Sequence, residues 1–194
     1  MISPSEKLAL LNEKVAACKL CPVLAENRTQ TVLGDGDPEA DVVLIGESPG
    51  KNEDEQGIPF VGRAGELLNN ILTACKWERA NVYICNIVKC RPPSNRNPLE
   101  WEAKNCRKFL DLQLKIVAPK LIVCMGAVAA NNLLSNTDPI GMLRGRLHEH
   151  EGMAVVCTWH PAYLLRNPAK KEDAWADWEM AIEEYNRPDP IVTC

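Results

Sequence analysis

Apolar runs of strand length alternate along this chain with segments in which apolar residues recur at helical spacing. The strand candidates are residues 41–46, 81–88, 120–126 and 154–159, which are rich in Val, Ile and Leu. The helix candidates are residues 3–17, 64–76, 97–117, 127–134 and 167–186. Strands that alternate with helices indicate βαβ units with right-handed crossovers. We therefore expect an α/β protein with a mostly parallel sheet.

Polar residues and prolines mark the predicted helix starts. Ser3 and Glu6, with Pro4 between them, form the pattern of a capping box. Asn97–Pro98 and Asn167–Pro168 each read as an N-cap followed by a first-turn proline.

Three polar, glycine- or proline-rich loops follow three of the predicted strands. They cover residues 46–65, 86–98 and 160–168. Ligands of open parallel sheets bind beyond the carboxyl ends of the strands. We therefore expect these loops to converge on one edge of the sheet and to carry the chemistry.

Length and charge narrow the class of protein. The 194 residues suit one domain, 1–194, and no apolar run approaches the ~20 residues of a membrane-spanning helix. The first residues lack the pattern of a secretory signal, so we expect a cytoplasmic protein with reduced cysteines. A net charge of −4 excludes a uniformly basic nucleic-acid-binding surface.

Four of the nine cysteines have the surroundings of metal ligands. Cys18 and Cys21 form a Cys-x-x-Cys pair after the first helix, Cys90 follows the second strand, and Cys106 lies on the next helix. Four thiolates suit zinc or an iron–sulfur cluster, whereas the pair alone would suit a redox dithiol or a chance spacing. The spacing leaves these alternatives open. The other five cysteines are expected to be core residues or, at the C-terminus, idle: Cys75, Cys85, Cys124, Cys157 and Cys194.

The loop 46–65 offers glycines for close backbone approach and several carboxylates, but it lacks the Gly-Lys-Ser/Thr of a phosphate-binding loop. Phe60 lies outside any apolar periodicity, so it is either a loop anchor or a stacking platform. Glu53 and Asp54 are either functional or part of a solvated acidic turn.

Four motifs, in order along residues 10–186, together resemble the family 4 uracil-DNA glycosylases. They are Gly46-Glu-Ser-Pro-Gly50 with Glu53–Asp54, Pro59-Phe-Val-Gly-Arg-Ala-Gly65, Asn86-Ile-Val-Lys-Cys-Arg-Pro-Pro93 and His160-Pro-Ala-Tyr-Leu-Leu-Arg166. The resemblance implies a three-layer sandwich around a mostly parallel four-stranded sheet. It also implies a monofunctional enzyme that releases uracil from DNA, and a [4Fe–4S] cluster on Cys18, Cys21, Cys90 and Cys106.

The resemblance also implies roles for single residues. Phe60 would stack on a flipped-out base, Asn86 would read its edge, and His160 would stabilise the departing uracil anion. Glu47 is the carboxylate expected to orient water or oppose the positive charge on the sugar, which makes Glu47 and His160 the catalytic pair. Ser48 completes the uracil-binding set, and it stands where family 1 glycosylases carry an aspartate. The group that activates water therefore stays open.

Basic and acidic residues are concentrated in different segments, so a chain with a negative net charge can still bind DNA. Residues 87–108 carry six Lys or Arg against two Glu, a local balance of +4, while the last helix is acidic. Phosphate contacts supply the sequence-independent part of DNA binding. Leu164 or Leu165 could wedge into the duplex. The expected DNA-binding set is Arg63, Lys89, Arg91, Arg96, Leu164 and Arg166.

The expected partner is uracil-containing DNA, single- or double-stranded, bound by a monomer that acts at the nucleoid and not at a membrane. Two other classes compete with this interpretation. One is a non-catalytic module that binds uracil-containing or damaged DNA, and the retained Glu47, Asn86 and His160 disfavour it. The other is an iron–sulfur redox carrier, which the long glycine-rich loop disfavours.

Overall fold

The computed structural model describes residues 2–188 and centres on one six-stranded sheet. The strands are β1 Gly34–Gly36, β2 Val42–Gly46, β3 Tyr83–Asn86, β4 Leu121–Met125, β5 Leu147–His150 and β6 Met153–Thr158. Their order is β1-β3-β2-β4-β6-β5, with β3, β2, β4 and β6 parallel and the two edge strands antiparallel. The α/β class is confirmed. The expected four-stranded sheet is wrong in strand number, because the sheet is mixed and has six.

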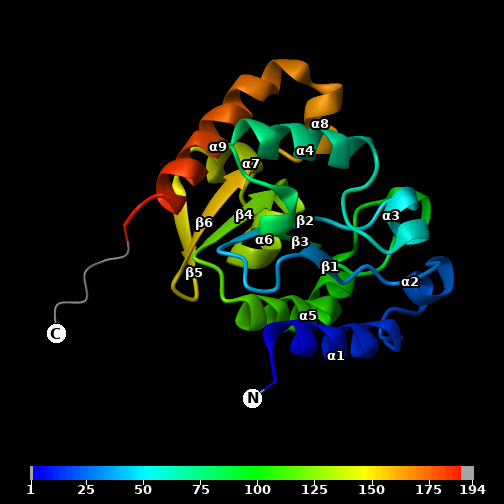
Figure 1. Ribbon diagram of the computed structural model, residues 1–194. Helices are drawn as coiled ribbons and strands as arrows, with labels where there is room; N and C mark the ends of the chain where they lie inside the picture. Colours follow the sequence, from blue (N-terminus) through cyan, green and yellow to red (C-terminus); the bar gives the residue numbers. More distant parts are fainter. Residues whose placement is uncertain (1, 189–194) are drawn as a thin grey trace.

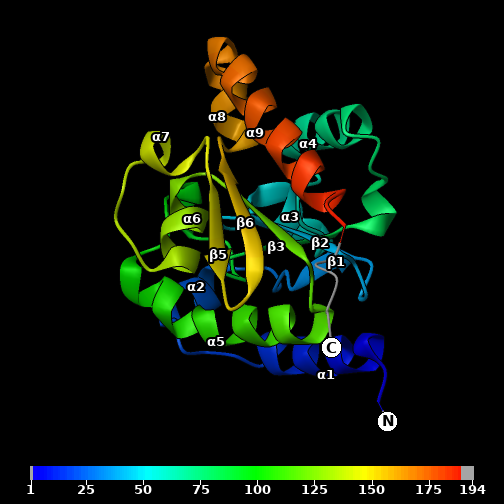
Figure 2. The same ribbon diagram turned by 90° about the vertical axis from the view of Figure 1, so that its left-hand side faces the viewer.

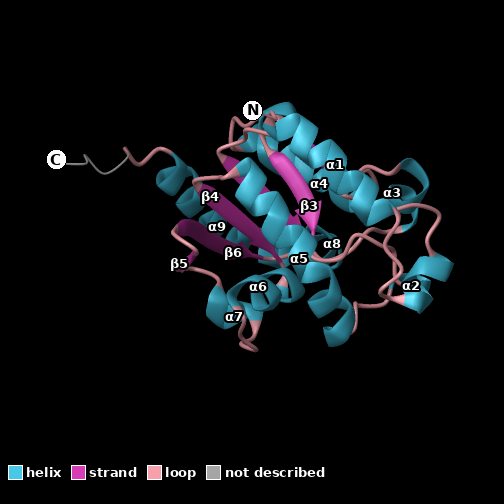
Figure 3. Ribbon diagram, turned by 90° about the horizontal axis from the view of Figure 1, so that it is seen from below, coloured by secondary structure: helices cyan, strands magenta, loops and turns pink. Residues whose placement is uncertain are grey.

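Helices cover both faces of this sheet (Figures 1 and 2). They are α1 Pro4–Ala16, α2 Pro22–Asn27, α3 Lys51–Gln56, α4 Arg63–Ala74, α5 Glu100–Val117, α6 Ala127–Leu134, α7 Ile140–Leu143, α8 Pro161–Arg166 and α9 Lys171–Tyr185. Buried side chains of α1, α5 and α6 pack on one face, which Figure 3 views from the side of α1 and α5. Leu68 and Leu72 of α4 and Trp178 of α9 pack on the other.

The helix starts agree only in part with the sequence. The capping box of Ser3 and Glu6 is present, with the Ser3 N–H donating to Glu6 Oε2 at 2.7 Å. The N-cap expected at Asn97 is wrong, because α5 begins at Glu100 and the carboxylate of Glu102 accepts the Leu99 N–H at 2.7 Å. A short 3-10 turn, Pro168–Lys170, separates Asn167 from α9. None of the described helices is long and apolar enough to cross a membrane.

The parallel centre of the sheet brings the three loops together. β2 ends at Gly46, directly opposite Asn86 at the end of β3, and β6 ends two residues before His160. The expected convergence of these strand ends on one edge is therefore present.

Candidate functional site

The candidate site begins at Gly46, whose lack of a side chain lets Asn86 and Phe60 lie close against its backbone. A Cβ placed there would lie 2.4 Å from Asn86 Oδ1 and 2.6 Å from Phe60 Cζ. The Phe60 ring in turn stacks on the imidazole of His160, with ring centroids 5.6 Å apart. Residues from three loops thus meet at one point, as the sequence predicted.

Asn86 is buried, with 2% of its surface exposed, and its Oδ1 has no hydrogen-bond partner. A buried acceptor without a donor costs about 1–3 kcal/mol. The site therefore presents an acceptor that a donor on a bound ligand would satisfy.

His160 is the N-cap of α8, and its Nδ1 accepts the N–H of Ala162 at 3.0 Å. Burial lowers the pKa of His160 to about 4, assisted by the positive charge of Arg166 and opposed by Glu53. The ring is therefore neutral at physiological pH. Because Nδ1 accepts, the proton of the neutral ring is on Nε2, which is available as a donor.

The loop that carries Phe60 is held by two charged side chains. Phe60 has a left-handed backbone, φ 53°, which is unusual for a bulky residue. Glu53 Oε1 accepts the N–H groups of Val61 and Gly62 at 2.9 Å each. Arg79 donates to the carbonyl oxygens of Pro59 at 2.7 Å and Phe60 at 3.3 Å.

The sequence did not indicate Arg79, because it lies in a short 3-10 turn outside the motifs and its partners beside Phe60 are backbone carbonyls. Arg79 also donates to Asn69 Oδ1 at 3.0 Å and lies 3.7 Å from Asp35 Oδ2. Asp54 is buried, and both of its oxygens accept the Thr29 N–H at 3.0 Å. The solvated acidic turn is therefore the wrong alternative for Glu53 and Asp54, because both carboxylates fix loop backbone.

A groove of about 500 Å³ runs alongside this site and is lined by Glu47, Ser48, Trp159, His160, Tyr163 and Arg166, among others. Burial raises the pKa of Glu47, the carboxylate predicted to be catalytic. Trp159 and Tyr163 stack with ring centroids 4.7 Å apart. The sequence did not indicate this aromatic pair, although Tyr163 lies within the His160 motif and Trp159 directly precedes it.

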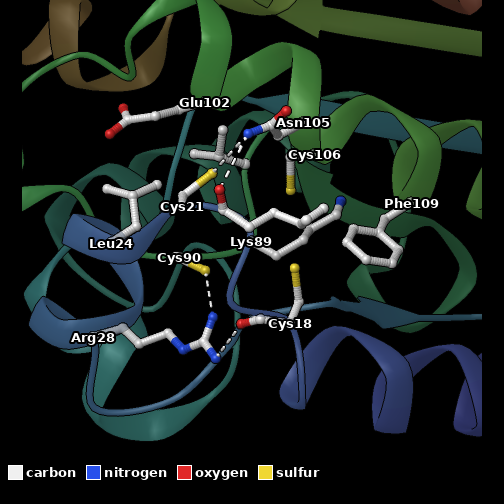
Figure 4. A pocket seen from close by; sticks show the side chains of 12 residues that line it. Cys18, Cys21, Leu24, Arg28, Lys89, Cys90, Glu102, Asn105, Cys106 and Phe109 are labelled. Atoms are coloured by element: carbon white, nitrogen blue, oxygen red, sulfur yellow. Dashed lines mark hydrogen bonds between the residues drawn. The ribbon is translucent and has the colours of Figure 1, made fainter.

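A second site, the cysteine cavity, is lined by Cys18, Cys21, Cys90 and Cys106 (Figure 4). Arg28 donates to Cys90 Sγ at 2.9 Å and to the carbonyl of Cys18 at 2.9 Å. Burial, opposed by Lys89 and assisted by the charges of Cys90 and Cys21, raises the pKa of Cys106 to about 11. The four sulfur atoms thus lie close enough to influence one another.

The donor set of the cysteine cavity fits an iron–sulfur group. A tetrahedral zinc site with bonds of 2.3 Å would bring its sulfur atoms within about 3.8 Å of one another. Among residues 2–188, no three His, Cys, Asp or Glu side chains are grouped to hold a single metal ion. Four cysteine side chains that line one cavity are the donor set that a [4Fe–4S] cluster takes. Four other cysteines are buried in the core, as predicted: Cys75, Cys85, Cys124 and Cys157. Cys194 lies outside the described residues.

Comparisons with known proteins decide the family. The sequence pattern of the Uracil DNA glycosylase superfamily matches residues 33–179. The chain belongs to this superfamily. Similar proteins include one from Thermotoga maritima, 43% identical over 86% of this chain and 88% of its own length, and one from Archaeoglobus fulgidus, 35% identical over 96% and 98%. A third, from Sulfurisphaera tokodaii, is 40% identical over 92% and 84%. All three are named Type-4 uracil-DNA glycosylase, so the resemblance drawn from the motifs is confirmed.

In this superfamily member, Arg63 and Arg166 are exposed as expected. Arg91 and Arg96 are half-buried. Arg91 Nε donates to Asn95 Oδ1 at 2.8 Å, and Arg96 pairs with the buried carboxylate of Glu102 at 2.7 Å.

Two residues of the expected DNA-binding set are wrong. Lys89 is fully buried and its ammonium points into the protein, so it has no surface for a phosphate. Leu164 is 1% exposed because it packs inward from α8, whereas the adjacent Leu165 is 38% exposed. Of the two leucines considered as a wedge, only Leu165 faces solvent.

Proposed function

We propose that this chain is a uracil-DNA glycosylase, which hydrolyses the N-glycosidic bond of a flipped-out deoxyuridine and leaves an abasic site for repair. The observation that carries the proposal is the buried, unpartnered Oδ1 of Asn86 beside the Phe60 ring. The names of the relatives support the same activity.

The amide of Asn86 matches the edge of uracil. Its Oδ1 accepts from N3–H and its Nδ2 donates to O4, whereas cytosine presents an acceptor at N3 and a donor at N4. A base in duplex DNA must leave the stack before it reaches such a site. Phe60 then supplies a face on which the base stacks.

Bond cleavage places negative charge on uracil and positive charge on the sugar. The Nε2–H of neutral His160 donates to uracil O2, where the negative charge develops. The carboxylate of Glu47 opposes the charge on the sugar and orients water. The water adds its hydroxyl group to C1′, and its remaining proton neutralises the departed base. Ser48 lines the same groove beside Glu47.

Cys18, Cys21, Cys90 and Cys106 are proposed to hold a [4Fe–4S] cluster. Iron–thiolate bonds would tie the end of α1 to the segment 90–106. This segment carries Arg91 and Arg96, so the cluster's role in this proposal is structural.

DNA phosphates are proposed to contact Arg63, Arg91, Arg96 and Arg166, on single- or double-stranded DNA. The charge of Arg166 already acts on His160, which places this arginine next to the proposed catalytic site. The chain is proposed to act as a monomer and a single domain, 1–194, in the cytoplasm, at the nucleoid.

The test is to incubate the purified protein with a uracil-containing oligonucleotide and then treat it with alkali. Free uracil and strand scission are expected. The excision rate of the Asn86→Ala variant should fall at least about a hundredfold. The reason is that N3–H and O4 of uracil would lose their partners in a site that recognises its base by hydrogen bonds. Asn131→Ala is the matched control, since Asn131 on α6 also has an unpartnered buried Oδ1 but does not line the groove. A complex without cleavage would contradict the proposed catalysis and identify a non-catalytic binder. The absence of both cleavage and binding would overturn the proposal entirely.

A further inference from the structure

Lys89 is a fully buried lysine whose ammonium group donates to a main-chain carbonyl. Its side chain is 0% exposed, and its Nζ donates to the main-chain oxygen of Asn86 at 2.6 Å. A buried ammonium is costly unless it is both hydrogen-bonded and compensated by negative charge. A neutral carbonyl satisfies one donor and supplies no such compensation, so the charge must be balanced elsewhere.

The balance lies in the cysteine cavity, which Lys89 also lines (Figure 4). The backbone N–H of Lys89 donates to Cys106, and both residues line this cavity. The Lys89 carbonyl accepts the Val32 N–H at 2.8 Å. The residue is therefore fixed at its backbone and at its ammonium, between two functional groups.

Formal charges support this arrangement. Four thiolates around a 2+ iron–sulfur core carry a net charge of about −2. Lys89 and Arg28 together supply two positive charges at the wall of the cavity. Glu102 also lines the cavity, but its carboxylate is paired with Arg96. Only Lys89 extends from this cavity to the residue that reads the base, since Arg28 donates to Cys90 Sγ and to the carbonyls of Ala16 and Cys18.

We infer that Lys89 is a positioning residue that joins the cysteine site to Asn86, so that the bound cluster and the base-reading amide are held by one side chain. This inference rests on the proposed function. In the absence of the ammonium, the Asn86 carbonyl loses its donor and the end of β3 loses its attachment to the cysteine site. The orientation of the amide, on which uracil recognition depends, is then less restricted.

The test compares binding of two oligonucleotides that are not cleaved. One carries 2′-fluoro-2′-deoxyuridine, whose fluorine disfavours positive charge on the sugar, and the other carries a tetrahydrofuran abasic analogue. Lys89→Met keeps the length of the side chain. It should weaken the affinity for the 2′-fluoro-2′-deoxyuridine oligonucleotide about ten- to a hundredfold and leave the affinity for the abasic oligonucleotide unchanged. Iron per chain and the visible absorbance of the purified protein are measured in parallel, and both should fall in Lys89→Met.

Arg28→Gln is the matched variant, because it removes the other cation from the cysteine cavity without a contact to Asn86. It should lower iron retention while its iron-loaded fraction keeps the wild-type preference for uracil. In an Asn86→Ala background, Lys89→Met should cause no further loss of preference. Lys89→Gln, which also lacks the charge, replaces Lys89→Met in all comparisons if the latter does not fold.

Three results would overturn the inference. Lys89→Met could keep the wild-type preference for the uracil-containing over the abasic oligonucleotide, or Arg28→Gln could lose this preference to the same extent as Lys89→Met. The third result is additive losses of preference in the variant that combines Asn86→Ala with Lys89→Met. A wild-type protein that binds the two oligonucleotides equally would instead contradict the proposed function. The two failures are therefore distinguishable.

Discussion

Gly46→Ala tests the proposed base site with a single added carbon. The new Cβ would lie 2.4 Å from Asn86 Oδ1 and 2.6 Å from Phe60 Cζ, whereas ordinary contacts are about 3.5–4.0 Å. Each neighbour must therefore move by about 1 Å. Both are buried, at 2% and 6% exposed, and have little space to move into. Overpacking of this kind costs about 1–3 kcal/mol, and a displacement of the reading amide by about 1 Å costs about a hundredfold in rate.

The assay measures uracil release under single-turnover conditions and urea unfolding of the same samples. The variant should release uracil at least about tenfold more slowly, beyond what its folded fraction explains. Gly141→Ala in α7 is the matched control, since a Cβ there meets no atom within 4 Å. Gly141→Ala should keep the wild-type rate. Wild-type release by Gly46→Ala would refute the assignment of Asn86 and Phe60 to the base site.

Three further predictions concern His160, the Phe60 loop and the DNA surface. His160→Asn should slow excision by about 10²–10³, because the Nε2–H donor to the developing anion is lost and the shorter Asn amide does not reach its position. The pKa of His160 is about 4 in the folded protein, below its ordinary value of 6.5, so the unfolded chain takes up the proton first as the pH falls. The contribution of neutral His160 to the free energy of unfolding is present above pH 6.5 and is lost between pH 6.5 and 4, by up to about 3 kcal/mol. In urea unfolding, His160→Asn should lose less stability than the wild type over this pH range. An unchanged pH dependence would contradict this. Arg79→Met should weaken binding of uracil-containing DNA about tenfold by releasing the carbonyls beside Phe60, whereas equal weakening for abasic DNA would exclude a role in base binding. Arg166→Ala should lower the slope of log affinity against log salt by about 1 for any sequence, and an unchanged slope would remove Arg166 from the phosphate contacts.

The parallel centre of the fold could be predicted because its four strands are continuous apolar runs, as expected for strands covered on both faces. The edge strands could not. β1 is Gly-Asp-Gly, which carries no apolar pattern, and β5 is Leu-His-Glu-His, whose exposed alternation resembles a polar connection. Their strand character comes from hydrogen bonds to β3 and β6, and thus from tertiary structure.

The same distinction applies to the site. Asn86, Phe60 and His160 lie at strand ends or in the family motifs, so the sequence already predicts the roles proposed for them. Arg79 and Lys89 donate to main-chain carbonyls that only the folded chain brings to them. Lys89 also lies in a basic segment, so the sequence predicts a phosphate contact for it regardless of the direction of its side chain.

Because the side chain of Lys89 is buried, it is removed from the set of residues expected to contact DNA. Arg91 and Arg96 are half-buried and bonded to Asn95 and Glu102, so Arg63 and Arg166 are the exposed arginines of the predicted set. Arg63 begins α4 and Arg166 ends α8, and these two helices pack against each other. Since Arg166 lines the groove and Arg63 follows the loop of Phe60, phosphate contacts here would flank the site on two sides. Such contacts would fix the register of a strand while the base turns inward, so an acidic chain can bind DNA with few, well-placed cations.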